Sequence, residues 1–203
     1  MSGILKNIYI SKSRLFVDGK LVLQGESSIF VKFLKEVYKH SNMKYPKYYK
    51  MDALSKLGFI ASEILLKDFK LSCPSERIGV VFGNSISTYI VDSKHQETIN
   101  DKENYFPSPA NFVYTLPNVM TGEICIRNGF KGENAVFISE GFDHSFISDY
   151  IQMIYKANKA DLMIGGYVDA DEDSYEAFIF ITDKNGEQLK DEIENIYTDY
   201  KTK

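Results

Sequence analysis

The sequence predicts an α/β fold in which a mixed, mostly parallel sheet is flanked by layers of helices. Apolar runs of strand length, such as residues 77–83 (RIGVVFG) and 134–139 (NAVFIS), alternate with stretches whose apolar residues recur at helical spacing. Continuous apolar runs suit strands that are covered on both faces, and their alternation with helices is typical of parallel sheets. A hairpin precedes this alternation, and two neighbouring strands at residues 161–170 and 177–182 follow it.

The first third of the chain predicts a β-hairpin and then two helices. Asp18-Gly19 lies between two apolar runs and is a two-residue hairpin signal. Ser27 or Ser28 is placed to cap the first helix, and Asp52 is placed to cap the second. The apolar stripes of the two helices are Phe30, Phe33, Leu34, Val37 and Tyr38, then Leu57, Ile60, Ala61, Ile64 and Leu65.

The remaining helices are separated by clear breaks. Residues 91–109 form a long polar connection with room for a short helix. Pro117 interrupts the helical periodicity of residues 110–129, which predicts a kink or two helices, and Gly129 is a plausible stop. The last two helices present the stripes Phe146, Tyr150, Ile151, Ile154 and Tyr155, then Leu189, Ile193, Ile196 and Tyr197.

Composition narrows the class of protein. The chain has 203 residues, 44% of them hydrophobic, which suits one domain with a sizeable core. A net charge of −4 gives no support for nucleic-acid binding, so we expect no nucleic-acid partner. Cys73 and Cys125 are expected to be reduced thiols. No apolar run approaches the ~20 residues that a membrane span needs, and we expect a cytoplasmic protein.

Four segments, at residues 49–68, 77–85, 106–139 and 157–170, together resemble the N-terminal half of β-ketoacyl-acyl-carrier-protein synthases. In that family a helix beginning near Met-Asp precedes an xxGVVxG strand. LPN and GxxGxN segments then precede the nucleophile strand, and an ADxxxxGG strand follows the nucleophile helix. The match covers about residues 50–182 in the right order. The resemblance implies a thiolase-like half, so we expect residues 1–203 to form a single thiolase-like domain.

The chain departs from the family at the nucleophile. The family's turn reads approximately Ser-Thr-Ala-Cys-Ala-Ser, and alignment on the preceding strand places the cysteine position at Phe142. Phenylalanine forms no acyl-enzyme. The family's catalytic histidines and lysine come from a second half that has no counterpart here. We therefore expect no condensing activity and no catalytic residue, with Gly141, Phe142 and Asp143 lining what remains of the pocket.

The resemblance also implies partners. Relatives without the cysteine pair with an active synthase as chain-length factors, and short relatives occur with pathways for aryl polyene, flexirubin or similar lipids. We expect a catalytically inactive protein that assists fatty-acid or polyketide-type chain assembly by pairing with a synthase or an acyl carrier protein. In the family the strand before the nucleophile pairs across a two-fold axis. We also expect one face of the sheet to lack a cover, because in the family the second half covers it, and to expose apolar surface. Both features predict a homodimer or a heterodimer with a full-length synthase.

Two other functions stay open. The chain is alternatively an acyl-thioester-processing enzyme, a hydrolase or acyltransferase, that uses Ser145 or His144. Adjacent residues on a helix point about 100° apart, which places His144 badly for deprotonating Ser145. The other alternative is a module that binds an acyl or aromatic ligand.

Charged and metal-binding side chains give weaker signals. Lys44, Lys47 and Lys50 alternate with tyrosines and fit docking of an acidic carrier protein, stacking of single-stranded nucleic acid, or a solvated loop. The acidic loop from Asp169 to Asp173 lacks the spacing of a calcium loop and is interpreted as a solvated charge run. The three histidines have no ligand spacing, so we expect no metal and no cofactor.

Overall fold

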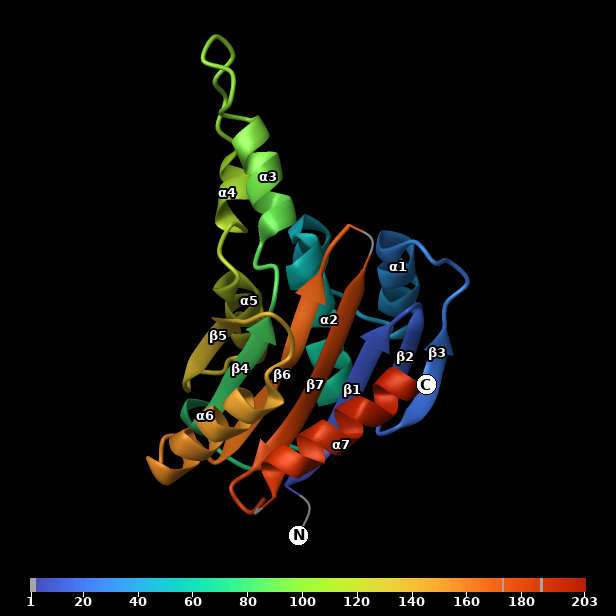
Figure 1. Cartoon of the computed structure of the whole chain (residues 1–203), viewed down its shortest axis with the longest axis vertical. Helices are drawn as coiled ribbons and strands as arrows, with labels where there is room; N and C mark the ends of the chain where they lie inside the picture. Colours follow the sequence, from blue (N-terminus) through green and yellow to red (C-terminus); the bar gives the residue numbers. More distant parts are fainter. Residues whose placement is uncertain (1–2, 173, 187) are drawn as a thin grey trace.

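The structure is a computed structural model that describes residues 3–172, 174–186 and 188–203. In these residues, a seven-stranded mixed sheet with helices on both faces forms the body of the molecule (Figure 1). The strands are β1 (Ile4–Ser11), β2 (Arg14–Val17), β3 (Lys20–Gln24), β4 (Ile78–Asn84), β5 (Asn134–Ile138), β6 (Leu162–Ala170) and β7 (Tyr175–Asp183). The α-helices are α1 (Phe30–His40), α2 (Ala53–Leu66), α3 (Tyr89–Glu97), α4 (Pro109–Val113), α5 (Asn118–Asn128), α6 (His144–Lys156) and α7 (Leu189–Thr202). Two short 3-10 helices, η1 (Pro46–Lys50) and η2 (Ser75–Arg77), precede α2 and β4.

The strands lie in the order β3-β2-β1-β7-β6-β4-β5. The mixed α/β sheet is confirmed, but its parallel part is smaller than expected. Only the β4–β5 and β4–β6 pairs are parallel, whereas the β1–β2, β2–β3, β1–β7 and β6–β7 pairs are antiparallel. The reason is that the N-terminal hairpin adds its strands to the same sheet, and β7 returns beside β6 without a crossover helix.

Of the turn and helix-cap predictions for the first third of the chain, the turn and one cap are confirmed and one cap is wrong. Asp18 and Gly19 form the expected turn with φ values of 48° and 76°. Asp52 caps α2 by accepting from the Leu54 and Ser55 amides at 3.1 Å each, as expected. The capping prediction for α1 was wrong, because the residue before that helix is Ile29. The Ser27 hydroxyl instead accepts from the Ile29 amide at 3.2 Å, in a local turn outside the helix.

The later elements follow their breaks in the sequence. Pro117 separates α4 from α5, and Gly129 ends α5 in the left-handed conformation at φ 72°, as expected. Strand β4 is buried along its whole length, which confirms a strand covered on both faces. Strand β5 differs from expectation, because it is the last strand of the sheet and is only half-buried.

Each face of the sheet carries its own apolar core. Helices α1, α2 and α5 cover one face, and α6 and α7 cover the other (Figure 1). The expectation that one face lacks a cover was therefore wrong. Helix α7 buries Leu189 and Ile193 against that face, and its Tyr200 ring stacks on Tyr9 of β1 with ring centroids 4.8 Å apart.

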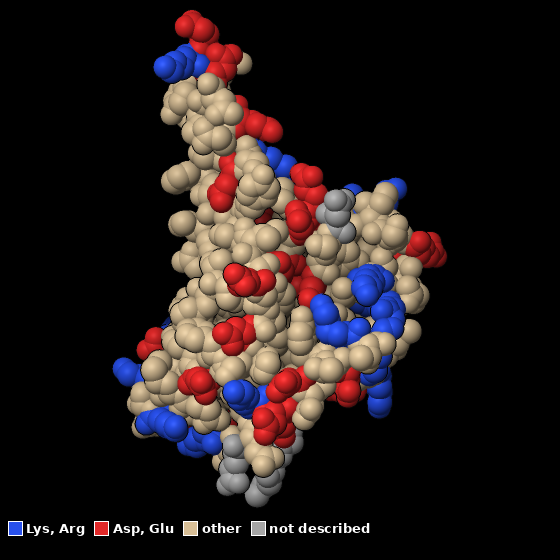
Figure 2. All heavy atoms as spheres, in the orientation of Figure 1, with Lys and Arg blue, Asp and Glu red and all other residues tan. Residues whose placement is uncertain are grey.

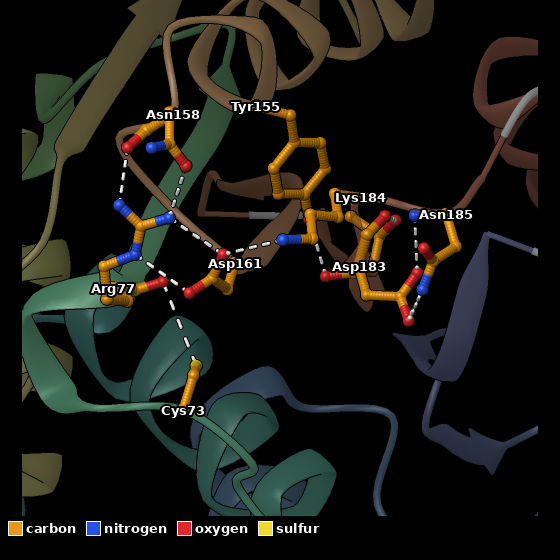
Figure 3. A network of polar contacts seen from close by, with 9 residues as sticks. Cys73, Arg77, Tyr155, Asn158, Asp161, Asp183, Lys184 and Asn185 are labelled. Atoms are coloured by element: carbon orange, nitrogen blue, oxygen red, sulfur yellow. Dashed lines mark hydrogen bonds and ion pairs between the residues drawn. The ribbon is translucent and has the colours of Figure 1, made fainter.

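An ion-pair network joins three elements at one end of the sheet (Figure 3). The Arg77 guanidinium donates to both carboxylate oxygens of Asp161 at 2.9 and 2.8 Å, and to Asn158 at the end of α6. Lys184, beyond β7, lies 3.3 Å from the same carboxylate. These hydrogen bonds lower the pKa of Asp161 to about 2 from its ordinary 3.8. The ionised carboxylate thus ties the starts of β4 and β6 to the end of β7.

The network makes stability depend on pH in a defined window. A carboxyl whose pKa is lower in the folded than in the unfolded protein adds stability above its unfolded pKa, and this contribution is lost as the pH falls through the folded value. We expect Asp161→Asn to lower the urea midpoint at neutral pH. The deficit relative to the native chain should shrink as the pH falls from about 4 towards about 2. Glu140→Gln, at an exposed site, is the control, and an Asp161→Asn deficit that does not change with pH would contradict the assignment.

Candidate functional site

The elbow is the segment Ser139–Ser145, which joins the end of β5 to the start of α6. The Ser139 amide donates to the Asn84 carbonyl at the end of β4 (3.0 Å), and its hydroxyl donates to the Gly141 carbonyl (2.7 Å). Asp143 caps α6 by accepting from the Phe146 amide at 2.9 Å. The expected strand–turn–helix corner is therefore present, at the edge of the sheet where parallel strands end.

The side chain of Phe142 packs into an aromatic cluster between the sheet and α7. Its ring centroid lies 4.9 Å from that of Tyr197 on α7, 5.5 Å from that of Tyr167 on β6 and 5.9 Å from that of Phe178 on β7. Two of these contacts are edge-on, an arrangement that aromatic rings favour. Phe142, which we expect at the family's cysteine position, thus carries a ring that packs the elbow against the core, and this ring has no nucleophilic atom.

His144 and Ser145 follow in the first turn of α6, and they do not form a nucleophile–base pair. The Nε2 atom of His144 lies 3.4 Å from a carboxylate oxygen of Glu194 on α7. Within the described part of the chain, no hydrogen bond joins His144 to Ser145. The backbone explains this geometry, because consecutive helical residues point in directions about 100° apart.

A small cavity of about 170 Å³ lies beside the elbow. Its lining includes Asp143 of the elbow, Gly83 of β4, and the apolar side chains Phe137, Ile138 and Phe146. Gly141 and Phe142, which we expected in the pocket with Asp143, lie outside this lining. Drug-sized ligands occupy pockets of roughly 300–1,000 Å³, so this cavity suits one side chain or a short apolar group.

Two carboxylates near the elbow have structural roles that the sequence did not predict. Asp169, at the end of β6, accepts from the Asn84 side chain (2.8 Å), the Ser85 amide (3.1 Å), the Tyr167 hydroxyl (3.1 Å) and the Ser85 hydroxyl. The prediction that Asp169 belongs to a solvated charge run was therefore wrong. Burial raises the pKa of Tyr167 to about 12, so its hydroxyl stays protonated and donates. Asp173 of the same acidic loop lies outside the described residues.

Glu176, at the start of β7, is the second of these carboxylates. It accepts from the hydroxyls of Tyr9 (2.7 Å) and Tyr197 (3.1 Å), and Lys201 lies 3.0 Å from both of its oxygens. Burial, together with Glu176 itself, raises the pKa of both tyrosines. The partners come from β1 and α7, which no local sequence pattern brings together with β7. For Asp169, by contrast, the sequence holds a usable signal: a carboxylate near the end of an apolar strand is a candidate for a structural role at the edge of the sheet.

Neither cysteine offers a substitute nucleophile. Burial raises the pKa of Cys125 to about 11, and it also raises the pKa of Cys73. The thiolate is the reactive form of cysteine, so both groups are poorly reactive at neutral pH. Among the described residues, no three His, Cys, Asp or Glu side chains converge as metal ligands. In the same residues, no helix combines the length and apolarity that crossing a bilayer requires.

The three candidate docking lysines lie in different environments. Lys47 forms a 2.7 Å ion pair with Glu123, a carboxylate that is only 4% exposed. Its charge therefore compensates a buried carboxylate, and removing it would leave Glu123 with the Tyr114 hydroxyl as a neutral partner but without its cation. Lys44 is exposed and lines two shallow surface hollows, and Lys50 is exposed at the end of η1.

The Phe142 packing predicts a measurable loss of stability on truncation. Because its ring is partly buried against three others, we expect Phe142→Ala to lower the free energy of unfolding by about 2 kcal/mol. Phe106→Ala, which truncates a ring that is 74% exposed, should cost far less. Urea unfolding curves of both variants decide this, and equal losses would show that Phe142 is not part of the core.

Comparisons with known proteins address the fold and the family. The ishigamide ketosynthase/chain length factor has a TM-score of 0.64 at 14% identity, over 90% of this chain and 62% of that chain. A second similar structure is that of a type II polyketide synthase acyl-carrier protein in complex with its ketosynthase, bound to the hexaketide. Its TM-score is 0.60 at 14% identity, and the match covers 89% of this chain and 62% of that chain. The structure of a ketosynthase (ApeO) in complex with its chain length factor (ApeC) from Xenorhabdus doucetiae has a TM-score of 0.62 at 9% identity. The match covers 91% of this chain and 79% of that chain.

These structures share the fold at low identity, and the chain spans about 62% of the length of the first two. A comparison with curated proteins gives no match. The family described as "Beta-ketoacyl synthase, N-terminal domain" matches residues 21–178, which is more than half of the sequence. The protein therefore belongs to the β-ketoacyl synthase family, through its N-terminal domain.

Proposed function

We propose that this chain is a catalytically inactive, ketosynthase-like subunit that pairs with a β-ketoacyl synthase and assists fatty-acid or polyketide-type chain assembly. The observation that carries the proposal is the packing of Phe142, the residue that the sequence aligns with the family's cysteine, against rings of the core. A condensing enzyme needs a thiolate there to accept the acyl chain. Two of the structurally similar proteins contain a ketosynthase and a chain length factor, and this pairing supports the same kind of role here.

No strand in the described part of the chain pairs with the outer edge of β5, and this free edge supports pairing. The Glu133 carbonyl accepts from Val80 (2.8 Å) and the Ser139 amide donates to Asn84 (3.0 Å), so the backbone groups of odd-numbered residues face β4. Because backbone direction alternates along a strand, the groups of Asn134, Val136 and Ile138 face outward. An unpaired edge of this kind readily accepts another strand. In the family this strand pairs across a two-fold axis, so a partner of the same fold would complete the edge.

Exposed apolar surface next to β5 supports a large contact. Ile138 is 50% exposed, and Phe146 and Met153 on α6 are also exposed. Helices α3 and α4 form an arm that projects beyond the sheet (Figure 1). The arm and its tip expose Tyr89, Tyr105, Phe106, Phe112, Val113 and Leu116. On the side of the molecule that carries α4 and β5, Figure 2 shows few charged side chains. Apolar surface of this extent usually marks an interface.

A full-length synthase is the favoured partner, with a second copy of this chain as the other possibility for the same edge. A synthase would supply the thiolate that this elbow lacks, so the pair would retain one active site. The aryl polyene or flexirubin-like pathways implied by the resemblance are the proposed setting.

Native purification followed by mass spectrometry tests the proposal. Stoichiometric recovery of a synthase or an acyl carrier protein is the expected result. Recovery as a monomer at high concentration, with no affinity for any synthase of the source cell, would overturn it. Acyl-thioester hydrolysis by the purified chain that Ser145→Ala or His144→Ala abolishes would replace it with the enzyme alternative.

The edge geometry predicts a selective pairing variant. Val136→Pro removes an outward-facing amide and leaves the hydrogen bonds to β4 intact, so the sheet should tolerate it. Val136→Ala removes the same apolar side chain but keeps the amide. We expect the proline variant to weaken pairing by at least about tenfold, because it loses a ladder hydrogen bond and blocks strand addition. Analytical ultracentrifugation measures this, with circular dichroism to verify folding; pairing that survives in Val136→Pro would exclude the β5 edge.

Carrier docking makes a separate prediction. We expect the double variant Lys44→Glu and Lys50→Glu to weaken binding of an acyl carrier protein by about fivefold at low salt, because two exposed favourable charges become repulsive. Lys47 is left unchanged because it compensates Glu123. Lys20→Glu with Lys102→Glu gives the same change in net charge elsewhere and serves as the control in a titration by fluorescence anisotropy. Equal weakening in both double variants would exclude a specific site at η1.

A further inference from the structure

A second, larger cavity lies at the end of the sheet that carries the elbow. It measures about 420 Å³ and lies where β1 and β6 end and β7 begins, with the last turn of α7 at its side. Ligands of α/β sheets bind outside the carboxyl ends of the strands, and β1 and β6 both end here. The volume is in the range of roughly 300–1,000 Å³ typical of small-molecule sites. The elbow residues do not line it.

The two carboxylates in its wall are already satisfied. Asp169 accepts hydrogen bonds from Asn84, Ser85 and Tyr167, and Glu176 accepts from Tyr9, Tyr197 and Lys201. These oxygens have little capacity left for a further hydrogen bond, and the Lys201 ammonium pairs with the Glu176 carboxylate. A bound cation or a ligand rich in donors therefore finds few free acceptors in this cavity.

The unused groups in the same wall are donors. Within the described residues, the Lys12 ammonium and the hydroxyls of Ser28 and Ser174 make no hydrogen bond, and all three line the cavity. Lys201 has a third N–H beyond the two directed at Glu176. Figure 2 shows basic side chains gathered beside the C-terminal end of α7. Arg14 and Lys203 are neighbours, since both lie within 6 Å of the Phe16 ring.

The β1–β2 hairpin turn places Lys12 at the cavity. Lys12 and Ser13 are its two central residues, with φ values of 48° and 58°. Positive φ at both central residues is the geometry that favoured two-residue hairpin turns adopt. Here the buried Ser13 amide donates to the Tyr175 hydroxyl (2.7 Å), and the Ser13 hydroxyl donates to the Ser27 carbonyl (2.7 Å).

From these contacts we infer that the cavity binds the phosphate group of a small polar phosphate monoester. Lys12 and Lys201 supply the charge, and Ser28 and Ser174 supply neutral donors. Four donors from four separate segments suit a tetrahedral phosphate, whose oxygens accept from several directions, better than a planar carboxylate. The remaining volume accommodates a hydroxylated organic body. Tyr167 connects this site to the elbow, because its ring contacts Phe142 and its hydroxyl donates to Asp169 in the cavity wall.

Calorimetric titration of the full chain with glucose 6-phosphate and glycerol 3-phosphate tests the inference. Glucose and inorganic phosphate serve as comparison ligands. We expect saturable binding of at least one ester, at least fivefold weaker binding of inorganic phosphate, and no binding of glucose. Lys12→Gln should weaken ester binding at least fivefold. Lys20→Gln, on the neighbouring hairpin turn outside the cavity, should leave it unchanged.

Three results would overturn the site: no saturable binding of either ester, equal affinity in Lys12→Gln, or glucose binding as tightly as glucose 6-phosphate. Inorganic phosphate that binds as tightly as the esters would reject an organic ligand. Thermal unfolding of Lys12→Gln verifies that the variant is folded, since Lys12 is exposed and has no partner among the described residues. The result is independent of the proposed pairing function, because the cavity lies away from β5.

Discussion

Packing of the aromatic side chains of α7 onto the sheet is the interaction on which the rest of this structure depends. Tyr200 stacks on Tyr9 of β1, and Tyr197 meets Phe142 of the elbow and Phe178 of β7. The Tyr197 hydroxyl and Lys201 also bind Glu176. Rings of this size contribute large buried areas and favourable edge contacts. Helix α7 therefore covers the core on one face of the sheet, contacts the elbow through Tyr197, and forms part of the wall of the 420 Å³ cavity through Lys201.

This cover bears on where the chain exposes apolar surface. We expected one face of the sheet to be uncovered, but helices cover both faces. The exposed apolar surface lies at the β5 edge and on the α3–α4 arm. The placement matters, because an edge pairs by backbone hydrogen bonds and fixes the orientation of its partner, whereas a face does not. This placement of the exposed apolar surface is consistent with the proposed pairing through the β5 edge.

At the elbow, some features depend on neighbouring residues in the sequence and others depend on contacts with distant segments. The strand, the turn and the Asp143 cap were all readable from residues 134–146, because each depends on neighbours in the sequence. The direction of the Phe142 ring was not, since β6, β7 and α7 supply its contacts. The same holds for Asp169, whose donors come from β4 and β6 and withdraw it from the acidic loop in which the sequence places it.

By itself, the sequence determined the α/β class, most strand and helix positions and the family, and it predicts the loss of the nucleophile. Periodicity, turn residues and motif order are local properties, so no tertiary information was needed for them. Only the tertiary structure decided the proportion of antiparallel pairing, the exposure of β5 and the cover that α7 provides. It also decided how Asp169, Glu176 and Lys12 share one cavity wall. These features depend on which distant segments meet, and burial and hydrogen bonding between such segments leave no periodic trace in the chain.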